Sequence, residues 1–527
     1  MLKNSTVLFL MLVAILLFRV TVEAEPKQKP NVIFIYADDL GRGMLSYEGQ
    51  EIVKTPHIDK LADEGLRFNQ VRGCMFCAPA RASLLTGYHD CNTDKWEITG
   101  GSAYKQAFSG EVSSEEISRA IEKQTGHISD SIITMAEVFK KAGYVTGEVG
   151  KLEWGFSVSF DEMKRHGWDY YYGYLDHVMA HGFYPPYMYE NGKKVDIPGN
   201  TRKDCGKTRE RETAETYRER WNMEGKKVYS QDLFLEKILS FIRENKNRPF
   251  FLYHPTQLPH GPVAVPVVHP DFENDNRLTQ IEKEYASMVK LLDDNVGVII
   301  KELKKLKLDK NTIIIFSADN GHEIYYSQEG RILKPVRNML TGEQFDNINT
   351  KFYSETGGDV FNGNDGMAGL KYNNWEGGVR VPLIIKWPGI TPKGKAVDNL
   401  VANYDLLSTF ADILGVDLEE QKDGLSLLPV LTGENPDAEH DYTVNASMQG
   451  GMLVTKDGWK LRHFYPKSIF QLYYLPDDYR EEHNLAEQYP EKVQELKGIL
   501  LKECNGDLGN GYFTYQKFVL PKVRMEH

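Results

Sequence analysis

The sequence predicts an α/β protein with a mainly parallel central sheet flanked by helices, and with a smaller C-terminal α+β subdomain. Short apolar runs alternate with helical patterns over most of the chain, which is typical of strands joined by helical crossovers. The 527 residues are enough for one large α/β domain and a second, smaller one. An apolar content of 41% and a charged content of 26% are those of an ordinary globular protein.

The expected strands are short runs rich in branched and aromatic residues, and the expected helices carry apolar residues at helical spacing. Strands are predicted at 31–37, 249–254, 312–318 and 381–387, with a weaker one at 144–149. Helices are predicted at 58–66, 131–142, 232–244 and 284–306. After a polar stretch around 433–440, the tail predicts strands at 451–455, 459–464 and 470–474 and a helix at 490–501. We therefore expect a main domain over 30–435 and a C-terminal subdomain over 436–527.

The N-terminus has the layout of a signal peptide over residues 1–24. Lys3 precedes an apolar run from Val7 to Phe18, and small residues follow at Val22 and Ala24. The run is about 12 residues long, short of the ~20 that a spanning helix needs, so cleavage is favoured over an anchor. We expect a secreted or periplasmic protein with no stable membrane insertion. A net charge of −12 also argues against a nucleic-acid binder.

The chain has five cysteines: Cys74, Cys77, Cys91, Cys205 and Cys504. In an oxidising compartment, pairing into disulfides is the default, and an odd count leaves at least one thiol over. If Cys77 is the odd one, the other four allow three pairings, and all three stay open.

Polar side chains follow four of the expected strands. Asp38 and Asp39 come directly after 31–37, and Asp319 and Asn320 directly after 312–318. Lys151 follows the weaker strand and His260 lies shortly after 249–254. Ligands bind at the carboxyl ends of strands in open α/β sheets, and hard oxygen donors suit Ca²⁺ or Mg²⁺ better than Zn²⁺. Either acidic pair alone is more often a turn, but the two together favour a metal site.

Residues 77–87 read CAPARASLLTG, a Cys-x-Pro-x-Arg motif with a Leu-Leu-Thr-Gly extension. This segment resembles the signature of the type I, formylglycine-dependent sulfatases of the alkaline-phosphatase-like superfamily. The resemblance extends over nearly the whole mature chain, through NVIFIYADDLG, SADNG, KYNNWEGGVRVPLIIKWPG, GWKLRHF and LYYLPDDYREEHNLA.

The resemblance implies that a maturation enzyme converts Cys77 to formylglycine, whose hydrate attacks the sulfur of a sulfate ester and later collapses to release sulfate. It implies one Ca²⁺ per chain, held by Asp38, Asp39, Asp319, Asn320 and residue 77. In the family pattern Arg81 orients the hydrate, Lys151 and Lys371 clamp the sulfate oxygens, and His260 protonates the leaving oxygen.

One position departs from the family pattern. The family has Gly-Lys-x-His after this strand, whereas this chain has Gly150-Lys151-Leu152-Glu153. The Glu153 carboxylate could serve as the base that collapses the adduct, but it would also repel sulfate. Either another histidine takes that role, with His322 as a candidate, or turnover differs from the family norm.

Two segments suggest a sulfated saccharide as substrate. Residues 168–189 are dense in aromatic rings, which either stack on sugars or form a hydrophobic cluster. The polar stretch 323–370 is long for a structureless connection. We therefore predict hydrolysis of sulfate esters on a carbohydrate. The alternatives are a phosphodiester or phosphonate monoester hydrolase with the same nucleophile, and a non-catalytic glycan-binding relative.

Overall fold

The computed structural model describes residues 29–92, 94–96, 113, 128–151, 159–175, 177, 179–202, 213–326, 332–333, 337–338, 348 and 350–513. The residues described between Asn31 and Phe513 belong to one compact unit. The predicted signal peptide, Glu153 and Cys205 lie outside the described residues.

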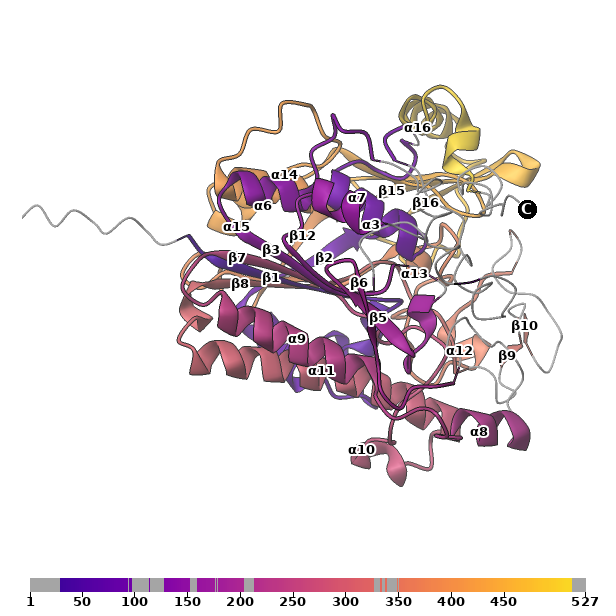
Figure 1. Cartoon of the computed structure of the whole chain (residues 1–527). Helices are drawn as coiled ribbons and strands as arrows, with labels where there is room; N and C mark the ends of the chain where they lie inside the picture. Colours follow the sequence, from indigo (N-terminus) through magenta and orange to yellow (C-terminus); the bar gives the residue numbers. More distant parts are fainter. Residues whose placement is uncertain are drawn as a thin grey trace, which may run out of the picture. The chain divides into compact units, whose positions relative to one another are not determined.

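The centre of the fold is a ten-stranded, mostly parallel sheet (Figure 1). Its strands follow the order β12 (Lys395–Ala402), β2 (Leu66–Arg72), β11 (Leu383–Lys386), β8 (Thr312–Ala318), β1 (Asn31–Ala37), β7 (Phe250–Pro255), β3 (Val145–Gly150), β4 (Tyr170–Gly173), β5 (Tyr187–Glu190) and β6 (Lys193–Asp196). The five strands from β8 to β4 are parallel to one another, whereas β11, β5 and β6 pair antiparallel to their neighbours. The predicted fold class is confirmed.

Strand β1 lies in the middle of the sheet because its sequence, NVIFIYA, offers apolar side chains to both faces. All seven of its residues are buried, as expected for a parallel strand covered on both sides. It pairs with β8 in a register that places Ala37 opposite Ala318, and with β7 so that Tyr36 lies opposite Pro255. The ends of these three strands therefore lie side by side.

Helices cover both faces of the sheet (Figure 1). One face carries α9 (Ser230–Glu244) and α11 (Gln280–Lys305), and the other carries α3 (Cys77–Thr86), α6 (Met135–Lys141) and α14 (Asp405–Leu414). Helix α11 begins after Thr279, whose backbone N–H donates to Oε2 of Glu282 at 2.8 Å, so this free N–H group at the start of the helix is satisfied. Asp293 of α11 accepts hydrogen bonds from the first turn of α2 (Pro56–Glu64), at 2.9 and 2.8 Å.

The C-terminal part forms a separate antiparallel sheet of β13 (Tyr442–Asn445), β14 (Met452–Thr455), β15 (Trp459–Phe464) and β16 (Ile469–Tyr474), followed by α16 (Pro490–Glu503). A buried ion network ties this sheet to the large one. Lys460 on β15 contacts Glu376 at 3.0 Å and Glu481 at 2.8 Å, and Glu376 also pairs with Arg72 at 2.7 Å. Each of these buried charged side chains therefore contacts one of opposite charge, which offsets the cost of removing it from water.

Several elements differ from the sequence predictions. The helix predicted at 58–66 ends at Glu64, because Gly65 follows it and Leu66 already begins β2. Strands β2, β12, β4, β5 and β6 were not predicted, since they are short or only partly apolar. Most aromatic rings of the 168–189 segment are buried, Trp168 and Tyr171 among them at 1% and 0% exposure. Burial favours the hydrophobic cluster over a sugar-stacking platform for these rings.

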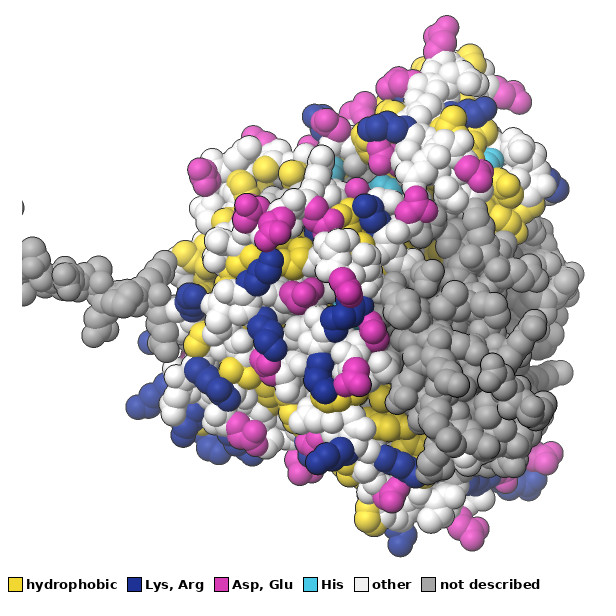
Figure 2. Space-filling view, turned by 45° about the horizontal axis from the view of Figure 1, so that its top comes forward, with side chains coloured by type: hydrophobic (Ala, Val, Ile, Leu, Met, Phe, Trp, Pro, Cys, Tyr) yellow, Lys and Arg dark blue, Asp and Glu magenta, His cyan; other side chains and the backbone are white. Residues whose placement is uncertain are grey.

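In the described part of the chain, no helix has both the length and the apolar character to cross a membrane. On the face drawn in Figure 2, Lys and Arg side chains are interspersed with Asp and Glu. This mixed pattern is that of an ordinary solvated surface.

Candidate active site

Three parallel strands, β1, β8 and β3, are each followed by polar side chains at one edge of the sheet. Asp38 and Asp39 follow β1, and Asp319 and Asn320 follow β8. Lys151 follows β3, and its backbone N–H bonds the carbonyl of Pro255 at the end of β7. The carboxyl ends of parallel strands meet at the same edge, so the fold brings these residues together as the sequence predicted.

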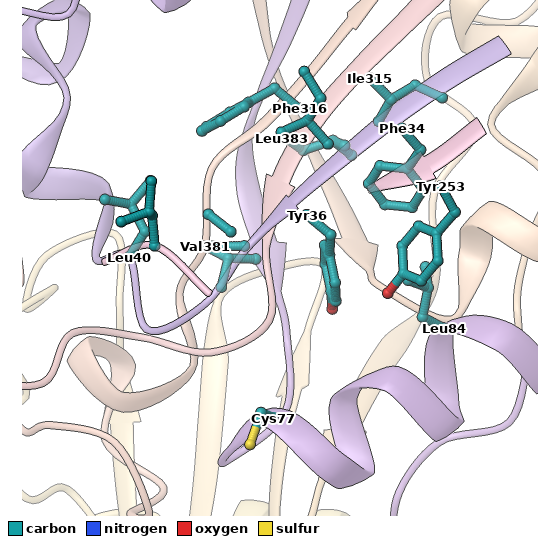
Figure 3. Packing of buried hydrophobic residues seen from close by; sticks show 14 of the residues in the cluster. Phe34, Tyr36, Leu40, Cys77, Leu84, Tyr253, Ile315, Phe316, Val381 and Leu383 are labelled. Atoms are coloured by element: carbon teal, nitrogen blue, oxygen red, sulfur yellow. The ribbon is translucent and has the colours of Figure 1, made fainter. Parts of the chain in front are cut away.

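The signature segment is placed against this edge by the end of β2. The backbone N–H of Cys74 donates to the carbonyl of Asp319 at 3.0 Å, and Gly73 lies against the same carbonyl. A Cβ at position 73 would lie 2.2 Å from the Asp319 oxygen, so only glycine allows this approach. The chain then enters α3, with Cys77 in its first turn (Figure 3). Backbone N–H groups at the start of a helix favour an anion nearby.

Three carboxylates lie together beneath Cys77 and are fully buried. Ligand atoms of Asp38, Cys77 and Asp319 lie within 4.8 Å of one another, as do those of Asp38, Asp39 and His260. Burial, followed by repulsion from Asp38, raises the pKa of Asp319 well above its ordinary value. Such a cluster of buried negative charge is unfavourable unless cations neutralise it.

Three basic side chains surround the carboxylates. Lys151 forms an ion pair with Asp38, and Lys371 contacts Asp39 at 2.6 Å. Arg81, one helical turn after Cys77, lies 3.3 Å from Asp319 and 3.7 Å from Asp38 through Nη2. All three basic side chains are buried. Burial raises the pKa of the Cys77 thiol, and the two lysines lower it in part.

Histidines complete the site, and two of them were not predicted. His177 lies against Cys77, with its Nε2 and Nδ1 atoms 3.6 and 3.8 Å from Sγ. The ring of His181 lies 4.4 Å from that of His177 and stacks on His260 at 4.3 Å. His260 in turn lies 3.4 Å from Asp39. The three imidazoles therefore form a row from Cys77 to the carboxylates.

His322, the histidine suggested from the sequence, does not contact Cys77 in the described structure. Its Nε2 lies 2.6 Å from the Tyr326 hydroxyl and 3.8 Å from Asp359. His177 and His181 belong to the aromatic segment 168–189, whose composition indicated a cluster but not a catalytic position. Tyr325 was also missed, and its hydroxyl donates to Asp39.

The donor set fits a hard cation such as Ca²⁺. Within the described residues, Oδ1 of Asp38 and Oδ1 of Asn320 are buried and accept no hydrogen bond. Burying an oxygen acceptor without a partner is costly, and a bound cation removes that cost. Asp39 and Asp319 supply further oxygens next to these two. Oxygen-only sets of this kind are those that Ca²⁺ prefers.

The sequence matches known protein families along most of its length. A family model described as sulfatase matches residues 30–416, and one described as N-sulphoglucosamine sulphohydrolase, C-terminal, matches residues 371–505. The chain is 29% identical over 534 aligned residues to an N-acetylgalactosamine-6-O-sulfatase of Bacteroides thetaiotaomicron, covering 90% of this chain and 93% of that protein. It is 29% identical to human N-acetylgalactosamine-6-sulfatase over 77% of this chain and 66% of that one.

Solved structures show the same fold. One is a sulfatase of Bacteroides thetaiotaomicron, solved in connection with the metabolism of multiple glycosaminoglycans. It is 26% identical, with a TM-score of 0.64, and the match covers 91% of this chain and 100% of that one. The phosphonate monoester hydrolase of Agrobacterium radiobacter is 18% identical, with a TM-score of 0.57, over 90% of this chain and 95% of that one. At that identity the likeness shows the fold alone.

The fold and the site define a hydrolase of the alkaline-phosphatase-like superfamily. Within it, the chain belongs to the sulfatase family and is a sulfuric ester hydrolase.

Proposed function

We propose that this protein removes sulfate from a sulfated carbohydrate, using a formylglycine at position 77 and one bound Ca²⁺. The observation that carries the proposal is the placement of Cys77 in the first turn of α3, next to the buried carboxylates of Asp38 and Asp319 and close to the buried ammonium groups of Lys151 and Lys371. A saccharide substrate is supported by the full-length similarity to an N-acetylgalactosamine-6-O-sulfatase. Family membership favours an enzyme over a non-catalytic glycan-binding relative.

Asp38, Asp39, Asp319 and Asn320 would hold the calcium, together with residue 77. A formylglycine at position 77 would supply a hydrated aldehyde as the nucleophile, and a calcium ion held by these residues would make its hydroxyl easier to ionise. In the structure, Sγ of Cys77 stands for the oxygens of that group. A bound metal would share the negative charge of Asp38 and Asp39, which Lys151 and Lys371 otherwise neutralise. Their ammonium groups can then attract the sulfate oxygens.

Arg81 orients the side chain at position 77. Its Nη2 atom contacts Asp319, whereas Nε and Nη1 make no hydrogen bond within the described residues although they are buried. These donors are placed to bind an oxygen of a modified residue 77 or of the bound sulfate.

Two histidines divide the proton transfers. His260 lies at the carboxylates, where it can protonate the leaving alcohol oxygen. His177 contacts position 77 directly, and we infer that it accepts the proton from the side chain at that position. It would thereby replace the family histidine, whose place in the sequence is taken by Glu153. Glu153 remains the alternative base for this step.

The proposed export of the protein rests on the sequence of residues 1–24. N-terminal mass analysis of the purified protein is expected to begin after Ala24. Protein that keeps an intact Met1 terminus and remains in the cytoplasm of the host would contradict the proposed export.

Mass spectrometry of the peptide containing residue 77 tests the proposed nucleophile. Protein made with a maturation enzyme should show the aldehyde in place of the thiol, and an unmodified thiol throughout would overturn the mechanism.

Kinetics on paired sulfate and phosphate esters of one alcohol test the reaction class. We expect faster sulfate release, whereas faster turnover of the phosphate or phosphonate ester would favour the alternative hydrolase.

A further inference from the structure

Two cysteines outside the active site are brought together from opposite ends of the chain. Cys91 lies shortly after α3, and Cys504 directly follows α16. Both are fully buried thiols in the structure. Contact with the Cys504 thiol, followed by burial, raises the pKa of Cys91 well above its ordinary value.

The neighbours of both cysteines are in contact on either side of the pair. Before Cys91, Nε2 of His89 lies 3.2 Å from Oε2 of Glu503. After it, Nδ2 of Asn505 donates to Asp94 at 3.3 Å. These two contacts join segments about 410 residues apart in the sequence and place Cys91 opposite Cys504. A disulfide requires two cysteines whose sulfur and Cα atoms lie close together, and the paired neighbours on both sides of Cys91 and Cys504 favour that arrangement.

Cys74, the remaining described cysteine outside the nucleophile position, has different surroundings. Its Sγ lies 3.5 Å from the Ser83 hydroxyl and 4.0 Å from the Asn403 amide oxygen. Its neighbours are therefore polar groups of the signature segment and of the loop before α14. Of the described cysteines, Cys91 and Cys504 have the arrangement suited to pairing.

We propose that Cys91 and Cys504 form a structural disulfide when the protein is exported. This bond would link the C-terminal subdomain to the segment that follows helix α3. The inference depends on export but not on the reaction of the active site. It selects one of the pairings that the sequence left open, and it leaves Cys77 free for conversion to formylglycine.

The reaction is a pair of thiol–disulfide exchanges with an oxidant of the exporting compartment that carries a disulfide. One cysteine thiolate attacks the oxidant's disulfide, giving a mixed disulfide and one free thiol on the oxidant. The second cysteine then attacks the mixed disulfide, the Cys91–Cys504 bond forms, and the oxidant leaves as a dithiol. The protein loses two electrons and two protons, and the oxidant gains them. Because both sulfurs are buried in the folded protein, the exchange must precede the final packing of α16.

Peptide mapping tests the proposal on the full chain, produced with its leader in an exporting host and purified without reductant. The protein is unfolded in guanidinium with iodoacetamide, digested and analysed by mass spectrometry. We expect the Cys91 and Cys504 peptides as one linked species, two hydrogens lighter than their sum. Alkylation of both Cys91 and Cys504, in protein whose leader has been removed, would overturn the proposal. A link from either of them to Cys74 would overturn it as well.

A variant gives a second, independent readout. In Cys504→Ser, Cys91 should become alkylated, and the melting temperature should fall below that of the exported wild type, because a long closed loop no longer restricts the unfolded chain. Made in a reducing cytosol, wild type and variant should both lack the link and melt closer together. Equal melting temperatures for exported wild type and variant would contradict the inference. The state of residue 77 and sulfate release are measured separately, so failure of the disulfide is distinguishable from failure of the proposed reaction.

Discussion

His177 lies against Cys77, with its Nε2 atom 3.6 Å from Sγ. The contact joins the signature helix α3 to the loop after β4, two parts of the chain 100 residues apart. It places an imidazole next to the proposed nucleophile in a chain that has Glu153 where the sulfatase pattern has a histidine after Lys151. The site therefore contains a histidine in this position, supplied by a different segment.

Replacing His177 should slow turnover. We expect His177→Ala to lower kcat by about 10²- to 10⁴-fold, the range of a lost general base, with a smaller change in KM. Steady-state kinetics on a sulfate ester, with the aldehyde content of residue 77 measured in each preparation, check this. His322→Asn is the matched control, because His322 contacts Tyr326 rather than Cys77. Glu153→Gln decides between the two bases: if it loses more activity than His177→Ala, Glu153 has the role assigned to His177.

Arg81→Lys should lower the catalytic efficiency, kcat/KM, although it keeps the positive charge. The guanidinium contacts Asp319 through Nη2 and retains two buried donors for an incoming oxygen, whereas an ammonium cannot form the same fork. We expect kcat/KM to fall about 10²-fold, the cost of losing one pre-placed donor. Arg42→Lys, at a site paired with Glu48, should retain wild-type kinetics. Wild-type kcat/KM in Arg81→Lys would show that the charge alone suffices.

Removal of calcium should reduce both activity and thermal stability. A chelator is expected to lower the melting temperature, because the ion binds the folded state only, and added Ca²⁺ should restore it. Elemental analysis should find one calcium per chain. Asn320→Ala, which removes a buried oxygen without a hydrogen-bond donor, should abolish the calcium-dependent rise in melting temperature. Asn399→Ala, whose amide bonds Pro436 and Ala438 instead, should keep it.

The fold class could be predicted because the central strands are recognisable from their own short stretches of sequence. NVIFIYA and TIIIFSA are continuous apolar runs that end in acidic residues, so both the strands and the polar side chains after them follow from the sequence. Strands such as β2 could not be predicted, since LRFNQVR buries only part of its side chains and pairs with segments far along the chain.

The same distinction applies to the site. Asp38, Asp39, Asp319 and Asn320 lie at strand ends, and their convergence follows from parallel pairing alone. His177 and His181 lie in a loop whose path depends on tertiary packing, so no local pattern indicates that they reach Cys77. The Cys91–Cys504 contact is of the same kind, because it depends on how α16 packs.

The free energy of unfolding should depend on pH through one histidine outside the active site. Nε2 of His440 lies 2.6 Å from Oδ1 of Asp405, the first residue of α14. Burial alone lowers the pKa of His440, but the Asp405 carboxylate outweighs burial, and the net pKa is raised. Asp423 and Asp441 nearby act in the same direction.

A raised pKa means that the folded protein binds this proton more tightly than the unfolded chain does. The stabilisation is fully present below the unfolded histidine pKa of about 6.5, and it is lost as the pH rises through the higher folded value. His440→Gln should therefore lower the melting temperature at pH 5–6 and converge with the wild type at alkaline pH. Melting curves across this range check the expectation. His483→Gln, at a side chain that is 77% exposed, is the control and should follow the wild-type profile. A melting temperature of His440→Gln that differs from the wild type by the same amount at every pH would show that the pair acts through packing rather than through charge.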